Sequence, residues 1–255
     1  EIAAAAYARH AQYFAGFLAA HSQALKDAGQ AAALDTLHQE IENAQSAWAW
    51  QIRNQHSEQI CLCVNSLFQY FNIRSNFAVG MSWFQQAIQG LNDDGRPSRA
   101  LGMCLSRYGA LAFRQRHHDQ ALDALTRSQA IFNQLNEPGE LAFCLFYISG
   151  LQMRQATYDQ ALASAQQCLE FYRNLGDGWG EGAALYLIGL IKDRQGLFDD
   201  ALPFLEKALE LGRQAGDLHH LIAPLNLLGD IACVKGDYAA AEGFFLESLE
   251  ISRTL

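Results

Sequence analysis

Three arginines recur at a fixed spacing and are the residues of this sequence best suited to binding chemistry. Arg114, Arg154 and Arg194 follow one another at intervals of 40 residues. A guanidinium group is a planar fork of donors that matches a carboxylate or a phosphate through paired hydrogen bonds. The spacing therefore predicts a ladder of anion-binding groups. The alternative is that these arginines pair with carboxylates such as Asp193 and Asp230, and exposed pairs of this kind contribute only about 0–1 kcal/mol.

No catalytic or nucleotide-binding motif accompanies these arginines. The sequence lacks the GxxxxGK[ST], HExxH and GxSxG patterns. The glycine string of residues 176–182 imitates a phosphate loop, but such a loop follows a strand, and the same place in the other repeats reads as a turn. We therefore predict a protein that is not an enzyme and that binds no cofactor.

Metal binding is not predicted either. Cys61-x-Cys63 does not have the spacing of a zinc site. The adjacent histidine pairs 117–118 and 219–220 would point in different directions on a helix. We expect the six cysteines to be reduced and mostly buried, because the chain is long and carries no export signal.

Composition excludes several classes of partner. The 18 basic residues face 27 acidic ones, which gives a net charge of −9 and argues against direct binding to DNA or RNA. No apolar run reaches the ~18 residues that a membrane helix needs, so we expect a cytoplasmic protein without membrane contact. The chain starts at Glu1 rather than at methionine, so we expect it to be part of a longer protein.

The 40-residue spacing extends to the small and apolar residues. One alanine register contains Ala121, Ala161, Ala201 and Ala241, and one leucine register contains Leu105, Leu145, Leu185 and Leu225. A third register contains Gly109, Ser149, Gly189 and Gly229. We expect these small residues to let two helices approach closely. The residue three positions before each alanine, aromatic in most units, would fill the corner between the helices.

Each unit is predicted to be a pair of helices. Residues 158–175 carry the i, i+3, i+4, i+7 stripe of an amphipathic helix, and residues 139–155 are apolar on two faces. Glycine or asparagine ends the second helix of most pairs, where a left-handed residue is favoured, and an aspartate then caps the next helix.

This pattern resembles the tetratricopeptide repeat (TPR) family, which implies an all-α, right-handed superhelical solenoid of antiparallel helix pairs. The best unit matches with Leu185, Ile188, Gly189, Phe198, Ala201, Leu205 and Ala208. The last unit matches with Leu225, Leu228, Gly229, Tyr238, Ala241, Phe245 and Ser248. The repeat is longer than the usual TPR of about 34 residues, and the usual aromatic of the first helix is absent.

The TPR resemblance implies that the arginine register faces a concave groove. An aromatic wall and polar residues on the same helices would complete this groove. The predicted ligand-binding residues are Arg114, Arg154, Arg194, Phe113, Phe146, Tyr186, Asn226 and Asp230. Ser106 and Ala110 occupy the same registers in the first full unit.

Residues 1–56 are helical but outside the repeat register, with expected helices at about 2–26 and 31–53. The segments 34–43 and 47–50 resemble the link between the NTPase core and the repeat arm of bacterial STAND-class regulators. That resemblance implies an NTPase domain upstream in the parent chain and a sensor role for the repeats. The alternative is a generic helical cap. We expect about twelve helices, with a cap at 1–56 and hairpins at 57–97, 98–137, 138–177, 178–217 and 218–255.

The sequence thus predicts a non-catalytic arm whose groove binds a peptide, a protein segment or a small anionic ligand. The alternative is a structural scaffold for self-association or effector-domain contacts without a diffusible ligand. A scaffold would expose apolar residues on its edges or its convex side rather than in a groove.

Overall fold

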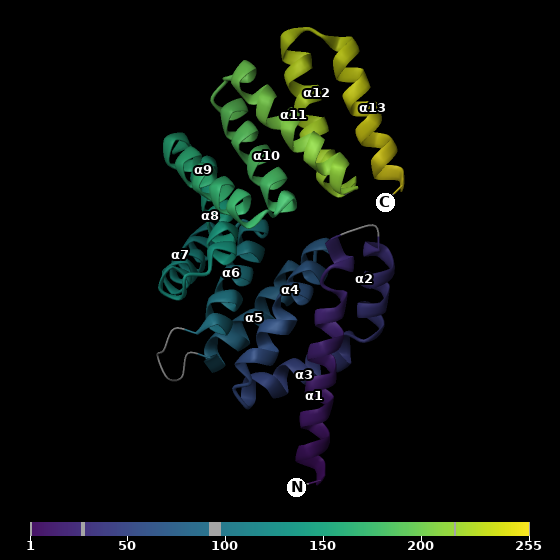
Figure 1. Ribbon diagram of the computed structural model, residues 1–255, viewed down its shortest axis with the longest axis vertical. Coiled ribbons are helices and arrows are strands. Elements are labelled where there is room, and N and C mark those ends of the chain that lie inside the picture. The colour runs from purple at the N-terminus through teal and green to yellow at the C-terminus, as the bar shows by residue number, and fades with distance from the viewer. Residues whose placement is uncertain (1, 27–28, 92–97, 217, 255) are drawn as a thin grey trace. The chain divides into compact units, whose positions relative to one another are not determined.

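A computed structural model describes residues 2–26, 29–91, 98–216 and 218–254 of the chain (Figure 1). In this part of the chain every regular element is a helix, comprising thirteen α-helices and one short 3₁₀ helix. The predicted all-α helical repeat fold is confirmed. None of the helices within these ranges is long and apolar enough to cross a membrane.

The chain divides into two compact units, residues 1–140 and 141–255. Unit 1 contains α1 (Ile2–His21), η1 (Ala24–Lys26), α2 (Gln30–Gln39), α3 (Ile41–Arg53), α4 (Ser57–Ile73), α5 (Phe77–Leu91), α6 (Arg99–Arg114), α7 (His118–Leu135) and the first turn of α8 (Pro138–Arg154). Unit 2 contains the rest of α8 with α9 (Tyr158–Leu175), α10 (Gly178–Arg194), α11 (Phe198–Ala215), α12 (Leu218–Lys235) and α13 (Tyr238–Thr254). Within a unit each hairpin packs on the next, as α10 does on α9 and α12 on α11.

Small residues set the close approach inside each hairpin. A Cβ atom added at Gly109 would lie 2.7 Å from the Leu125 side chain and 3.1 Å from the Ala121 carbonyl oxygen. Ser149 takes the glycine position in the next repeat, where its hydroxyl donates to the Ala161 carbonyl oxygen at 2.8 Å. The two alanines are fully buried. The predicted packing role of these small registers is therefore confirmed.

The expected aromatic corner forms in only part of the repeat array. Tyr158 and Phe198 are partly buried against the apolar clusters of unit 2. Tyr238, at the same register of the last hairpin, is 72% exposed. The prediction is wrong at this position, because the side chain packs against neither cluster and faces solvent.

The turns within and between hairpins follow the predicted pattern. Gly176 and Gly216 end α9 and α11 with left-handed backbones, at φ of 66° and 67°. Asp177 then accepts a hydrogen bond from the Gly180 amide at 3.0 Å and caps α10. Each residue thus supplies the conformation or the acceptor that a helix end requires.

One turn position offers a test of backbone strain. Ala156 has φ of 59° at the register where Gly196 and Gly236 have φ of 77° and 79°. Since a left-handed backbone is costly for a residue with a Cβ atom, Ala156→Gly should raise the free energy of unfolding by roughly 0.5–1 kcal/mol. Gly196→Ala is the matched control and should lower the free energy of unfolding by a similar amount. The added methyl group would meet open space, so only the strain of the left-handed backbone changes. Urea denaturation of both variants measures these changes, and two shifts of the same sign would contradict the prediction.

The N-terminal elements share the core of unit 1. The Gln51 side-chain amide donates to the Ala11 carbonyl oxygen at 3.0 Å, and the Ser66 hydroxyl donates to that of Leu18 at 2.5 Å. Both polar side chains are fully buried. Thus α1 and α3 lie against α4 through satisfied polar contacts as well as apolar ones.

The N-terminal helices differ from the expected pair. The expected helix at 31–53 is broken at Glu40, whose amide bonds back to Leu37 as a tighter turn does. This break accounts for a helix beyond the expected twelve. The division into a cap and five hairpins stays a proposal, and its boundaries at residues 97 and 217 and its end at 255 lie outside the described residues.

Candidate binding surface

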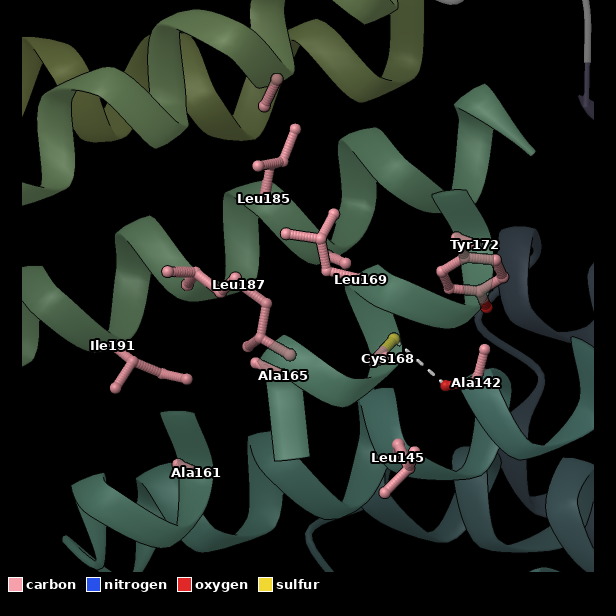
Figure 2. Close-up of a cluster of buried hydrophobic side chains, with 13 residues drawn as sticks. Ala142, Leu145, Ala161, Ala165, Cys168, Leu169, Tyr172, Leu185, Leu187 and Ile191 are labelled. Carbon is pink, nitrogen blue, oxygen red and sulfur yellow. Dashed lines mark hydrogen bonds between the residues drawn. The ribbon is translucent and has the colours of Figure 1, made fainter. Parts of the chain in front are cut away.

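Helices α10 and α12, the first helices of two successive hairpins, carry most of the predicted site residues of unit 2. The two helices contact each other directly. Tyr186 of α10 packs against two apolar clusters, one built around Ala165, Cys168 and Leu187 (Figure 2) and one built around Leu205 and Leu225. This packing holds the ring between the two hairpins, so its position depends on the repeat interface.

Two charged groups from the C-terminal end of α10, Asp193 and Arg194, lie near the Tyr186 phenol. Burial raises the pKa of the Tyr186 phenol, and the nearby Arg194 guanidinium opposes that rise. Burial also raises the pKa of the Asp193 carboxyl; Arg194 lowers it and the Asp230 carboxylate of α12 raises it further. Tyr186 and Arg194 therefore lie within electrostatic reach of Asp193 and of each other, and Asp230 lies within reach of Asp193. We call these four residues the α10–α12 patch.

Arg194 has an exposed guanidinium in this patch. Within the described residues no carboxylate oxygen lies within 4.0 Å of the Arg194 guanidinium, so Arg194 forms no salt bridge there. Lys192, two residues earlier, does form such a pair, with Asp200 at 3.2 Å. The guanidinium fork of Arg194 is thus available to a partner.

The other predicted residues lie apart from this patch in different ways. Phe146 of α8 is partly buried against the same apolar cluster as Tyr186. Arg154 is exposed at the end of α8, and Asn226 is exposed one turn before Asp230 on α12. In unit 2 the structure therefore places Tyr186 near Arg194 and Asp230 near Asp193, and Phe146 packs on an apolar cluster that Tyr186 shares.

The remaining two predicted residues belong to unit 1. The Arg114 guanidinium carbon lies 5.3 Å from the centre of the Phe77 ring, a cation–π contact. Phe113 is half-buried, with its ring 6.5 Å from that of His118. The expectation that Ser106 and Ala110 line the groove is wrong. Both are fully buried, and the Ser106 hydroxyl donates to the Met103 carbonyl oxygen at 2.9 Å.

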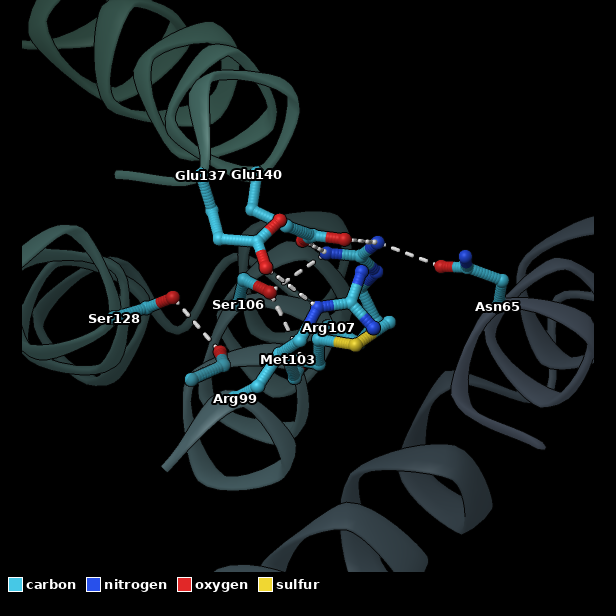
Figure 3. Close-up of polar contacts among 9 residues, drawn as sticks. Asn65, Arg99, Met103, Ser106, Arg107, Ser128, Glu137 and Glu140 are labelled. Atoms are coloured by element: carbon cyan, nitrogen blue, oxygen red, sulfur yellow. Dashed lines mark hydrogen bonds and ion pairs between the residues drawn. The ribbon is translucent and has the colours of Figure 1, made fainter. Parts of the chain in front are cut away.

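A buried polar cluster in unit 1 was missed at the sequence level (Figure 3). The Arg107 guanidinium of α6 binds both carboxylate oxygens of Glu140, one at 3.0 Å, and also donates to Asn65 Oδ1 at 2.6 Å. The side chains of Arg107 and Glu140 are only 5% and 11% exposed. The available signal was a charge in an apolar register, since Tyr147, Leu187 and Leu227 take the place of Arg107 in the other repeats. The cluster ties α4, α6 and the start of α8 together within unit 1.

The cysteines are all free, and four of them are buried. The Cys168 thiol donates to the Ala142 carbonyl oxygen at 3.2 Å (Figure 2), and burial raises its pKa to about 12. Burial likewise raises the pKa of Cys63 to about 12. Thiols held protonated in this way pack as small core residues, which agrees with the prediction for the buried four. Cys61 and Cys233 are only half-buried.

The described residues offer few groups that could hold a metal or a cofactor. Among the described residues no three His, Cys, Asp or Glu side chains form a cluster of metal-ligand type. A shallow hollow of about 430 Å³ lies where the α8–α9 turn faces Gln195, lined by Ala156, Thr157, Tyr158, Asp159, Gln160 and Gln195. Its lining carries one carboxylate and no cation, so it does not suit a phosphate-bearing cofactor.

The raised pKa of Asp193 predicts a pH-dependent contribution to stability. The folded chain binds this proton more tightly than the unfolded chain, so Asp193 favours folding below its unfolded pKa, and this advantage is lost as the pH rises through its folded pKa. Asp193→Asn should therefore raise the free energy of unfolding near pH 7 and shift the unfolding midpoint upward. The gain should be less than about 1 kcal/mol, because the carboxyl is partly solvated. The two proteins should unfold alike at about pH 3. Equal midpoints at both pH values, or a difference confined to acid, would contradict this assignment.

Part of the chain matches a known repeat family. Residues 180–254 match the family model described as a tetratricopeptide repeat. A search of curated proteins gave no match to the sequence. The TPR resemblance is thus confirmed for the two hairpins that contain the α10–α12 patch.

Solved structures extend the likeness of fold to almost the whole chain. A Rap protein complexed with Competence and Sporulation Factor matches with a TM-score of 0.70 and 14% identity, over 96% of this chain and 77% of that one. BtubC (BKLC) from P. vanneervenii matches with a TM-score of 0.62 and 14% identity, over 98% and 92%. Aspartyl phosphate phosphatase F from Bacillus subtilis matches with a TM-score of 0.61 and 14% identity, over 96% and 70%. At these identities the similarity is one of fold.

Proposed function

We propose that this chain is a non-catalytic, protein-binding repeat module and that the α10–α12 patch contacts a peptide segment of its partner. The exposed Arg194, near a partly buried tyrosine and the Asp193 carboxylate, carries this proposal. The similar Rap structure was solved as a complex with Competence and Sporulation Factor, which supports the use of this fold for binding.

The charges of the patch favour a peptide over a small anion. Arg194 can bind a carboxylate through two parallel hydrogen bonds, whereas Asp193 and Asp230 accept from amide or ammonium donors. A phosphate or a similar small anion would meet both carboxylates together with the guanidinium. Tyr186 adds a rigid ring with a polar tip, the kind of anchor found at the centre of interfaces. Binding of a small anionic ligand stays the alternative.

A peptide array tests the proposal directly. The wild-type chain is incubated with immobilised random 12-residue peptides, and the bound sequences are compared with those bound by Arg194→Ala. We expect enrichment of peptides with an acidic residue, and at least about tenfold weaker binding by the variant. Lys207→Ala is the control, because it removes the same charge from an exposed pair on α11. Equal binding by all three proteins would contradict the proposal.

The same array shows which of the three arginines, Arg114, Arg154 and Arg194, contribute to peptide binding. Arg114→Ala and Arg154→Ala should each weaken binding if the peptide extends along the first helices beyond α10. If only Arg194→Ala weakens it, contact is confined to the α10–α12 patch. Inorganic phosphate added as a competitor distinguishes the small-anion alternative, since it should then displace every bound peptide at millimolar concentration.

We propose further that the module is the sensor arm of a STAND-type ATPase, with an NTPase domain upstream in the parent chain. The resemblance of residues 34–43 and 47–50 to the core–arm link of that class supports this assignment. The N-terminal helices also share the core of unit 1, as a rigid link would. The coding sequence preceding residue 1 tests it: a phosphate loop within the same reading frame is expected, and an unrelated domain would exclude it.

A scaffold without a diffusible ligand is the second candidate. The observation that favours it is an apolar face on α13, where Leu246 and Leu249 are 52% and 45% exposed. Loss of peptide binding and retention of self-association would distinguish the two functions.

A further inference from the structure

The outer face of α13 continues the interface on which each hairpin of unit 2 is stacked. Leu249 occupies the register of Leu169 and Leu209, which are 6% and 4% exposed. Leu169 packs with α10 and Leu209 with α12, the first helix of the following hairpin in each case. Leu249 is 45% exposed because no such helix covers α13 in the described chain. Figure 1 shows α13 at the C-terminal edge of unit 2, next to α12.

At one position this face is more apolar than the same face of α9 and α11. Leu246 replaces Gln166 and Glu206, which are exposed polar residues in α9 and α11. Phe245, 37% exposed, is not part of this outer face, because its ring packs over Gly229 of α12. We call Leu246 and Leu249 the α13 stripe. An exposed apolar stripe of this kind indicates a surface that a partner covers.

Two residues of opposite charge, Glu242 and Arg253, lie at the two ends of the stripe and indicate which partner it binds. Glu242 lies four residues before Leu246, and Arg253 lies four residues after Leu249, so all four share one side of the helix. Neither charged residue makes an ion pair within the described part of the chain. Glu242 also replaces a leucine, since the residues at its register in α9 and α11 are Leu162 and Leu202. A charge introduced at the rim of an apolar stripe selects a partner with the opposite charge at that point.

We propose that the α13 stripe binds the α13 stripe of a second copy of this chain, with the two helices antiparallel about a two-fold axis. In this arrangement Leu246 of each copy meets Leu249 of the other, and Glu242 meets Arg253 at both ends. An isologous contact of this type is self-complementary, because the same residues serve both sides. A parallel pairing would instead place like charges opposite each other.

The interface is small, so the dimer is weak. A single helix pair with two exposed leucines on each side falls among contacts that bury less than about 1,200 Å² in total. We expect a dissociation constant on the order of 10–100 µM, in the range of transient association. The inference does not depend on the α10–α12 patch, which lies on other helices.

Sedimentation equilibrium of the full chain, from roughly 5 to about 500 µM, tests the proposal. The wild type should pass from monomer to dimer, and Leu246→Glu/Leu249→Glu should stay monomeric. Leu175→Glu changes an equally exposed leucine on α9 and should dimerise like the wild type. Circular dichroism establishes that each variant is folded.

Charge reversal tests the antiparallel geometry itself. Glu242→Arg and Arg253→Glu should each weaken dimerisation by at least about fivefold, because each places like charges opposite each other. The double variant Glu242→Arg/Arg253→Glu should recover the wild-type constant, and so should an equimolar mixture of the two single variants in part. A wild type that stays monomeric at every concentration, or a double variant weaker than either single one, would overturn the proposal and leave a helix of another origin as the cover of α13.

Discussion

Replacing Arg107 with leucine should lower the free energy of unfolding by about 3–5 kcal/mol, although leucine suits the register. The substitution leaves the Glu140 carboxylate, 11% exposed, buried without its guanidinium partner. It also removes the hydrogen bond to Asn65. Urea denaturation followed by tryptophan fluorescence measures the effect, since Trp48, Trp50 and Trp83 all lie in unit 1.

A second substitution separates the lost pair from lost packing. Arg107→Leu/Glu140→Leu removes both charges and should return to within about 1 kcal/mol of the wild type, because apolar replacement of a buried pair is often neutral. Arg99→Leu is the control, since its pair with Glu137 at 2.9 Å is exposed and should contribute no more than about 1 kcal/mol. The assignment fails if Arg107→Leu costs no more than Arg99→Leu.

Replacing Trp48 with alanine is expected to have an effect of similar size, about 3–5 kcal/mol of unfolding free energy. Trp48 is buried, its ring stands edge-on to Phe84 at 6.0 Å, and its indole nitrogen donates to the Trp83 carbonyl oxygen at 3.2 Å. The substitution removes the largest side chain that joins α3 to α5 and leaves a cavity. Urea denaturation again measures the change.

Trp50 provides the matched control on the same helix. Its ring is half-buried and stacks on His56 at 4.9 Å, so Trp50→Ala should cost less than about 1.5 kcal/mol. The loss of unfolding free energy in Trp48→Phe should lie between the losses in Trp48→Ala and Trp50→Ala. If Trp48→Ala leaves the unfolding midpoint unchanged, the N-terminal helices fold as an appendage rather than as part of the unit 1 core.

The repeat itself could be predicted from the sequence because its cause is steric. Positions such as Gly109, Ala161 and Ser149 are restricted to small residues by direct contact between helices, and this restriction recurs every 40 residues. The helix at 158–175 was predicted with the bounds that the structure shows. The break at Glu40 could not be predicted, because Leu37 and Trp48 on either side of it continue one apolar stripe.

The candidate site was less predictable, because it depends on contacts between separate elements. The 40-residue register identified Tyr186 and Arg194, which lie within electrostatic reach of each other, and Asp230, which lies within reach of Asp193. The same register gave no sign that Arg114 would lie over Phe77, a residue from the preceding hairpin. Whether these residues bind a ligand is a prediction that the peptide array tests.

The buried pair of Arg107 and Glu140 has a consequence for how such a chain reaches its native state. Successive hairpins are similar enough to dock in the wrong order, and domain-swapped or shifted assemblies are a known hazard of repeat chains. A hairpin one repeat out of place would present Gly180, not Glu140, to the Arg107 guanidinium. The guanidinium would then be buried among apolar residues without a carboxylate partner. This ionic contact therefore forms only when the correct hairpin docks beside α6, and it disfavours docking of the similar hairpins that follow.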